Sequence, residues 1–470
     1  MLAALRRLFR ATAARRFDAA AGGRRWDSRP TMGPWSPEVL QAAPAVRNRA
    51  RYFFANNAWA ASGVNALVTG LVGAGMTPAS LHPQAETRKL LASVFNRWAE
   101  KADADGVTDF SGLQAAATTG LVVDGEAFFH ILPTPEGLRL RLIPAEMVDA
   151  SHTWELPNGN RVIAGIEFDN AGNRLAYWVS PVRPTDIYVN YAPPIRVPVT
   201  EILHLFRPLG AGQVRGISWL ASVLERLLEL DQLEDALLVG AKVAAMHAGF
   251  LVDQNGTATG DNPYSDGKQS GSILESGLEP GTLKFLPPGW DVKFSSPQQA
   301  AETIGFAQLQ LRAVAAGLGL PEHLLTGDLR GANYSSLRAG LVAFRQRLEQ
   351  IQYHIIIPQV MRPVWERVIA FEVLRGTLAA PDFESNAADY FAAEWYPPAQ
   401  PWVDPLKDQQ AEALAVQSGF KSRRQVVAGQ GYNIEDVDAE IAADNQRAAK
   451  LGLKFGAPLP VTPQEDNANA

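Results

Sequence analysis

The chain of 470 residues contains no cysteine. This absence excludes disulfide bonds, thiolate nucleophiles and zinc sites with cysteine ligands. Histidine is scarce, with seven residues, and no two of them lie one helical turn apart, which excludes helical metal motifs such as HExxH. A phosphate-binding GxxxxGK[ST] loop is also absent, because Gly267-Lys268 is followed by Gln269. ATP hydrolysis through such a loop is therefore excluded, and the sequence contains no GxSxG nucleophile elbow either.

The sequence also lacks a convincing membrane span and a strong positive charge. The longest mostly apolar stretch, residues 58–76, contains four glycines together with Ser, Asn and Thr, so it is a poor candidate for a transmembrane helix. Hydrophobic residues make up 47% and charged residues 20%, which is typical of a folded globular chain. The formal net charge of −6 argues against a protein that coats nucleic acid, although DNA could still slide past it.

The N-terminal segment is basic and lacks the apolar core of a secretory signal. Up to Arg29 it carries eight arginines against two aspartates, and residues 26–46 are rich in Pro, Gly and Ser. We expect a disordered or loosely helical basic arm that continues as an extended arm to residue 45. A membrane-surface helix and a transit peptide are the alternatives.

The first half of the chain has the patterning of an α+β domain. Helical periodicity begins near Val46 and continues into the apolar stretch; further helices are expected over 85–99 and over 112–123, the latter capped by Ser111. Strand-like sequence follows the Asp-Gly-Glu turn at 124–126, and turn residues at 157–160 and 169–172 predict two hairpins. A short strand is expected over 202–206.

The second half is mainly helical. A long helix is predicted over 217–247 with Ser218 as its cap, and a second one over 298–317. The Gly-, Ser- and Pro-rich residues between them predict a small β or irregular excursion. A third long helix is expected from Ser335 to about Leu374, bent at Pro358 and Pro363, and short helices fill the last 70 residues.

The paired carboxylates do not form a recognisable catalytic constellation. Asp103 with Asp105 and Asp124 with Glu126 are interpreted as turn residues, and the acidic cluster over 435–440 as the start of a helix. A chain of this size without such a site is more often a scaffold or an assembly component than an enzyme. A hydrolase or transferase with a dispersed active site remains the alternative.

Several segments, taken together and in order, resemble the lambda-type family of bacteriophage portal proteins. They are RNRARYFFANNAWAASGVNALVTGLVGAGM, VVDGEAFF, GIEFDNAGNRLAYWV, VPVTEILHLFRPLGAGQVRGISWLASVL, AGLGLPEHLLTGDLRGANYSSLRAG and WVDPLK followed by SGFKS. The resemblance covers residues 45–455. It implies a portal fold, with an α/β wing, a stem of antiparallel long helices, a small β-containing clip and a helical crown, in a cyclic ring.

The resemblance also implies how the chain is divided. The expected segments are an arm (1–45), wing (46–216), first stem helix (217–248), clip (249–297), second stem helix (298–320), channel loop (321–334), long bent helix and wing return (335–399), crown (400–455) and flexible tail (456–470). A helix, a small β excursion and a second helix are also what a stem with a clip would look like from patterning alone.

The resemblance further implies a function in the virion. A ring of about twelve subunits at one capsid vertex would form the channel through which double-stranded DNA is packaged and ejected. The expected partners are the terminase large subunit, the major capsid or scaffold protein and head-completion or adaptor proteins, with no cofactor and no membrane. We expect assembly in the host cytoplasm.

Two groups of site residues are expected. Residues predicted to face DNA in the channel loop are Asp328, Arg330, Asn333 and Tyr334. Residues of the arm predicted to contact DNA or capsid are Arg6, Arg7, Arg10, Arg15 and Arg16. Arg330 either contacts phosphate transiently or pairs with an acid of a neighbouring subunit.

Overall fold

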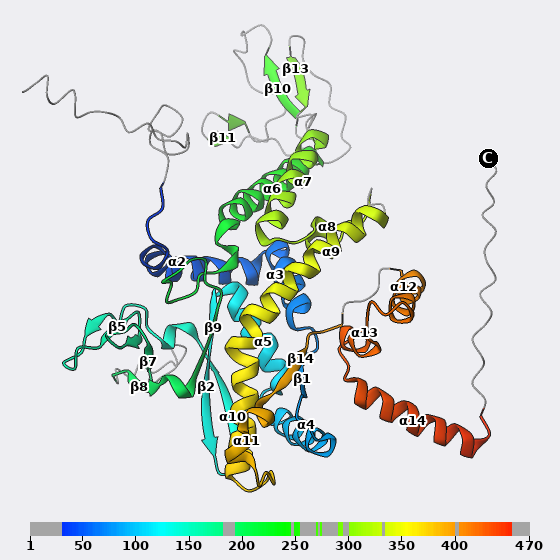
Figure 1. The fold of residues 1–470 in the computed structure, drawn as a ribbon. Helices are drawn as coiled ribbons and strands as arrows, with labels where there is room; N and C mark the ends of the chain where they lie inside the picture. Colours follow the sequence, from blue (N-terminus) through cyan, green and yellow to red (C-terminus); the bar gives the residue numbers. More distant parts are fainter. Residues whose placement is uncertain are drawn as a thin grey trace, which may run out of the picture.

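The protein has a mixed helix and sheet fold, which confirms the expected α+β class. The computed structural model describes residues 31–181, 193–245, 249–253, 269–270, 273–274, 290–294, 300–330, 334–399 and 404–453. Figure 1 shows a body of helices and sheets from which two helices, α6 (Leu224–Ala245) and α7 (Ala300–Leu318), project together.

The described chain opens with two helices, α2 (Trp35–Asn56) and α3 (Ala58–Val72). The expectation of an extended arm up to residue 45 is therefore wrong for residues 35–45. Val39, Ala43 and Ala50 lie buried on one face of α2, and this apolar stripe holds the helix together although Pro44 lies within it. Asn57 separates the two helices and caps α3, because its side chain accepts a hydrogen bond from the backbone N–H of Ala60.

Of the next two helices, the first packs against α10 (Arg362–Leu374) and the second packs against the three-stranded sheet described below. Helix α4 (Ala85–Ala99) has the predicted bounds, since Leu91, Phe95 and Trp98 form its buried stripe. Helix α5 (Phe110–Val123) begins earlier than predicted. Its cap is Asp109, whose carboxylate accepts the N–H of Gly112 at 2.8 Å, so the assignment of Ser111 as the cap is wrong.

Two antiparallel sheets follow in the sequence. The three-stranded sheet has the order β3-β2-β9, with β2 (Glu126–Thr134) in the centre. Its outer strands are β3 (Gly137–Ile143) and β9 (Ile202–Phe206). The five-stranded sheet is a meander of short strands: β4 (Trp154–Glu155), β5 (Arg161–Ile163), β6 (Ile166–Phe168), β7 (Arg174–Val179) and β8 (Ile195–Pro198). The two 3-10 turns are η2 (Ala145–Met147) and η3 (Val199–Glu201).

The hairpin turns of the meander are confirmed at residues 157–160 and 169–172. A third turn, at Ala164 and Gly165 between β5 and β6, was not predicted. Both residues have positive φ, +52° and +79°, as a two-residue primed turn requires. Ala164 is the only non-glycine residue with positive φ in the described part of the chain. The site below shows which contact holds it there.

The projecting helices begin with a short 3-10 helix, η4 (Trp219–Ser222). Ser218 caps η4 and not the long helix, which itself begins only at Leu224. Strands β10 (Gly249–Asp253) and β13 (Trp290–Phe294) pair in antiparallel fashion at the far end of α6 and α7 (Figure 1). A second small pair joins β11 (Gln269–Ser270) to β12 (Ile273–Leu274). Much of the rest of 249–299 lies outside the described residues.

The third long helix is continuous but not uniform. Helix α9 (Tyr334–Ile351) continues through a π-helical segment, η5 (Gln352–Met361), into α10 (Arg362–Leu374). Pro358 lies within the π segment, where the wider turn tolerates the missing N–H, and Pro363 lies in the first turn of α10. The chain then forms α11 (Phe383–Phe391) and β14 (Ala393–Tyr396), which pairs with β1 (Thr77–Ser80).

The last three helices lie to one side of the body (Figure 1). They are α12 (Pro405–Gln417), α13 (Arg423–Gly429) and α14 (Ile434–Leu451), and of all their residues only Ala448 is buried. Glu435, at the start of α14, pairs with Arg88 of α4 at 2.7 Å. This agrees with the interpretation of the acidic cluster as a helix start, since Glu435 and Asp436 lie in the first turn.

The core consists of two clusters. The larger one lies among α3, α4, α5 and α10, with Leu67, Phe95 and Trp365 fully enclosed. The smaller one lies between the two sheets around Phe128 and Tyr177. No helix within the described ranges is long and apolar enough to cross a membrane.

Candidate functional site

The predicted channel loop, 321–334, is not all loop, because it contains the short helix α8 (Glu322–Thr326); Asp328 and Arg330 follow this helix. Arg330 donates hydrogen bonds to the carboxylate of Asp328, the shortest at 2.8 Å, and these bonds lower the pKa of Asp328 to about 2. The Arg330 side chain is 88% exposed. Asn333 lies outside the described residues. Tyr334 opens α9, but its side chain is outside them too.

The same loop borders an open cavity of about 640 Å³. A second ion pair, Arg312 with Glu322 at 2.8 Å, lines this cavity together with Asp328 and Arg330. Arg312 and Arg330 are thus each paired with a carboxylate, and their charges are compensated on the surface that lines the cavity. The expected arm residues Arg6, Arg7, Arg10, Arg15 and Arg16 all lie outside the described residues.

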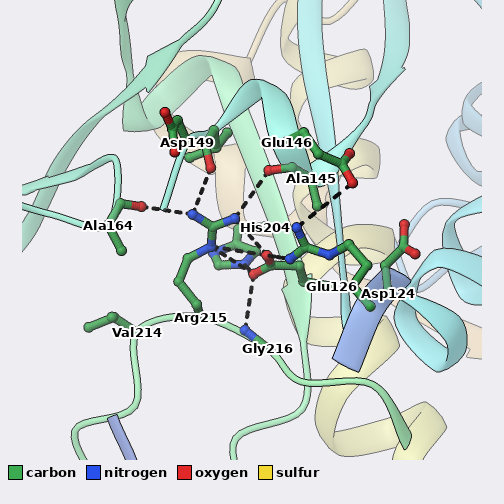
Figure 2. Close-up of polar contacts among 12 residues, drawn as sticks. Asp124, Glu126, Ala145, Glu146, Asp149, Ala164, His204, Val214, Arg215 and Gly216 are labelled. Carbon is green, nitrogen blue, oxygen red and sulfur yellow. Dashed lines mark hydrogen bonds and ion pairs between the residues drawn. The ribbon is translucent and has the colours of Figure 1, made fainter. Parts of the chain in front are cut away.

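The strongest polar cluster of the described chain surrounds Glu126, at the start of β2. The carboxylate is fully buried and accepts hydrogen bonds from Arg47 at 2.8 Å, from Arg215 at 2.6 Å and from the backbone N–H of Gly216 at 3.0 Å. His204 of β9 lies 3.2 Å from its second oxygen (Figure 2). Burial alone raises the pKa of Glu126, but the charge of Arg215 and the bonds from His204 and Arg215 outweigh it and hold the pKa well below its usual range.

Arg215 uses its whole guanidinium group in this cluster. Its Nε and Nη2 atoms bond Glu126, and Nη1 donates to the backbone carbonyls of Val148 and Ala164 at 2.8 and 2.7 Å. Nη2 also reaches the carbonyl of Ala145 (Figure 2). The contact with Ala164 explains the strained turn of the meander, because the positive φ places that carbonyl against the guanidinium. Arg215 therefore ties the five-stranded sheet to the three-stranded one.

The hydrogen bonds of His204 indicate its protonation state. Arg174 Nη1 lies 3.3 Å from Nδ1, and since a guanidinium has no acceptor, Nδ1 must be the unprotonated nitrogen. The proton is then on Nε2, which donates to Glu126. Burial lowers the pKa of His204 to about 4, against the opposing effect of Glu126. His204 is thus a neutral donor at pH 7, stacked between Phe128 and Phe206.

Three carboxylates of the cluster are matched by three arginines, while Arg174 lies beyond His204 without a carboxylate partner in the described part of the chain. Arg51 pairs with Asp124 at 2.6 Å and with Glu146 at 2.5 Å, next to Arg47. Glu126, Asp124 and Glu146 thus face Arg47, Arg51 and Arg215, with His204 neutral. Glu126 and Arg215 at the centre of this arrangement are buried and bonded to one another, so they hold together the segments that carry them.

The cluster lies where α2, β2, β9 and the segment leading to α6 meet. Arg215 and Gly216 belong to the segment just before η4, so the cluster fixes how the chain enters the projecting helices. Gly125 allows the turn before β2 to approach the segment before η4 closely, because a Cβ added to it would lie 2.1 Å from the backbone of Ile217. Among the residues that the structure describes, no group of three or more His, Asp or Glu side chains is arranged to hold a metal.

Sequence reasoning missed this cluster. The turn interpretation is right for Gly125, which has a φ of +90°, and wrong for Glu126. The signal was the placement of a charged residue at the start of a strand whose next three residues, Ala-Phe-Phe, are all buried. Asp103 was correctly interpreted as a turn residue, since its carboxylate accepts the N–H groups of Asp105, Val107 and Thr108.

Comparison with known proteins gives one family. A family model described as phage portal protein, lambda family, matches residues 22–352. The chain is 27% identical over 449 residues to a probable portal protein of Halomonas phage phiHAP-1, covering 91% of this chain and 85% of that one. It is 23% identical over 320 residues to portal protein B of Escherichia phage lambda, covering 62% of this chain and 59% of the lambda protein.

Two solved structures with a similar chain are a particle neck and a phage portal protein. One is the neck of a native gene transfer agent particle computed with C12 symmetry, with a TM-score of 0.46 and 17% identity over 85% of this chain and 95% of that one. Another is an HK97 family phage portal protein from Corynebacterium diphtheriae, with a TM-score of 0.31 and 15% identity over 66% and 91% of the two chains.

Proposed function

Because the chain belongs to the lambda family of phage portal proteins, we propose that it forms a ring of about twelve subunits at one vertex of a capsid. Double-stranded DNA would enter and leave through the axis of this ring. The observation that carries the proposal is the match of the family model to residues 22–352, joined by 27% identity to a probable portal protein over 91% of the chain.

The segments of the chain take their proposed roles from this assignment. The projecting pair α6 and α7 is the stem, within residues 217–248 and 298–320, and the small strands between them belong to the clip at 249–297. The wing is 46–216, joined by the return at 335–399. Helices α12 to α14 belong to the crown at 400–455, and their scarcity of buried residues suits helices that pack against neighbouring subunits.

The channel loop at 321–334 is proposed to face DNA. A channel that passes DNA in both directions must not neutralise many phosphates, because each contact releases counterions and creates a trap along the backbone. The pairing of Arg330 with Asp328 and of Arg312 with Glu322 supports this role, since paired cations bind phosphate weakly. Arg330 pairs with an acid of its own chain, a partner that sequence reasoning did not consider.

The proposed role is structural and not catalytic. Glu126 and His204 are the most perturbed acid and base of the described chain, and both are enclosed and fully bonded. The proposed partners are the terminase large subunit at the clip, head-completion or adaptor proteins, and the major capsid or scaffold protein. The proposed location is the capsid vertex, reached by assembly in the host cytoplasm.

The proposed basic arm gives the ring a second contact. Eight arginines up to Arg29 could bind packaged DNA, scaffold or capsid protein. Deletion of residues 1–29 is expected to lower incorporation into capsids while rings still assemble. Unchanged incorporation of the truncated protein would remove the arm from the proposal.

Mass and symmetry of the purified protein test the assembly. Twelve copies of a 50.9 kDa chain amount to roughly 610 kDa, and negative-stain images should show a ring with a central hole. Light scattering gives the mass. A protein that stays a monomer or a dimer, also with scaffold protein or at varied salt, would contradict the ring.

A further inference from the structure

Two arginines without a carboxylate partner among the described residues lie together at the base of α6 and α7, beside the ring of Trp219 in η4. They are Arg207, which follows β9, and Arg347 of α9. The Cζ atom of Arg207 lies 5.5 Å from the centre of the Trp219 ring, and Trp219 Nε1 is buried without a hydrogen-bond partner. Neither arginine pairs with a carboxylate anywhere in the described residues, although both are half-buried.

The carboxyl end of α7 brings the donors together. Arg347 lies directly against Gly319, since a Cβ added there would be 1.3 Å from its Nη1 atom. Gly317 lies against Val223, which follows η4. The partial negative charge at the end of α7 compensates Arg347 only in part. Burial and then the nearby charge of Arg207 lower the pKa of Arg347, as expected for a cation that lacks an acid.

A complementary surface lies on α6. Glu225 and Glu229 are exposed on its first turns and have no ion-pair partner within the described part of the chain. Leu228 lies between them and is 44% exposed. Helical spacing places these three side chains on one stripe of α6, which mixes acid and apolar groups as an uncovered contact surface does.

We propose that Arg207 and Arg347 of one subunit form a donor pocket, with Arg207 held over the Trp219 ring, that receives Glu225 or Glu229 from α6 of the adjacent subunit. This inference rests on the proposed ring. Neighbours in a cyclic ring lie at the same height, so the base of one stem faces the base of the next, and the first turns of α6 are at the height of the pocket. The contact is heterologous, with donors on one face and acids on the other, which is what closes a ring.

Charge reversal and its rescue test the contact. Arg347→Glu would repel the neighbour's acids, yet it places a carboxylate beside Arg207 in the same chain, so the subunit should melt at the wild-type temperature or above while assembly weakens. We expect the protein concentration at which half of the subunits are assembled to rise at least about tenfold, because breaking a close charge pair across an interface weakens binding by at least that much. Glu225→Lys with Glu229→Lys should weaken assembly likewise, and the combined triple variant should restore it.

The control is Gln346→Glu, which places a carboxylate on an exposed neighbour of Arg347 in α9 and changes the charge by −1, against −2 for Arg347→Glu. It should assemble as the wild type does in mass photometry. The proposal is overturned if Arg347→Glu assembles normally, or if the triple variant assembles no better than the single one. It is also overturned if Arg347→Glu rings form but lose DNA retention, because the pocket would then bind phosphate. Wild-type protein that forms no ring would instead contradict the proposed function.

Discussion

Removal of the charge of Glu126 is expected to destabilise strongly the part of the chain that contains the two sheets. In Glu126→Gln the side chain keeps its size, but Arg215 and Arg47 lose the carboxylate that compensates them in a site where Glu126 is 0% and Arg215 only 2% exposed. Breaking a buried ion pair from one side costs about 3–5 kcal/mol, because a charge remains without a partner. The amide also cannot accept the N–H of Gly216 and the bonds of Arg215 with both of its ends.

The measurement is urea unfolding of the variant and of the wild type at pH 7.5, followed by fluorescence and at one protein concentration, so that assembly contributes equally. The matched control is Asp438→Asn, which breaks the exposed pair with Arg423, both side chains being 51% exposed. That change should cost at most about 1 kcal/mol. A loss below about 1 kcal/mol for Glu126→Gln would refute the reasoning, since the cluster would then contribute no more than a surface pair.

Three further outcomes are expected. His204 binds a proton more weakly in the folded protein, where its pKa is about 4, than in the unfolded chain, where it is 6.5. Its contribution to stability is therefore complete above pH 6.5 and decreases by about 1.4 kcal/mol per pH unit as the pH falls toward 4. The variant His204→Gln should remove this pH dependence from the denaturant midpoints measured over that range, and an unchanged dependence would contradict the neutral state assigned to His204. Gly319→Ala should lower the melting temperature and reduce the free energy of unfolding by about 1–2 kcal/mol or more, because φ is +71° and the new Cβ meets Arg347. A melting temperature equal to that of the wild type would show that neither the positive φ nor the contact with Arg347 limits the residue at this position. Arg330→Glu should change the packaging rate or the retention of DNA while rings form normally, and loss of rings in electron micrographs would refute a role confined to the channel.

Local periodicity predicted much of the fold. The bounds of α4 and the strand at 202–206 follow from short-range patterns that the tertiary structure leaves unchanged. The prediction of an extended arm was wrong for residues 35–45, because it gave more weight to Pro44 than to the apolar residues that α2 buries. The turn at Ala164 was missed because alanine rarely takes a positive φ, and a contact with Arg215 from a distant segment helps to hold it.

The Glu126 cluster could not be predicted for the same reason. Each of its members is an ordinary charged residue in its own segment, and only the folded chain brings them together. The channel-loop prediction rests on the resemblance alone, and the structure adds the pairing of Arg330 with Asp328. Patterns in a single sequence therefore predict elements well and long-range ion pairs poorly.

The order in which the two sheets and the Glu126 cluster form follows from the position of Glu126 in the chain. Its side-chain partners Arg47, His204 and Arg215 are 79, 78 and 89 residues away in sequence. Closing loops of this length costs entropy before any contact is gained, and desolvating the carboxylate before its partners arrive is unfavourable. The cluster should therefore form after the local hairpin of β2 and β3, together with the equally long-range pairing of β2 with β9, and the entry to α6 should become fixed in that late step. The projecting helices α6 and α7 would thus be held in place only once the two sheets are joined.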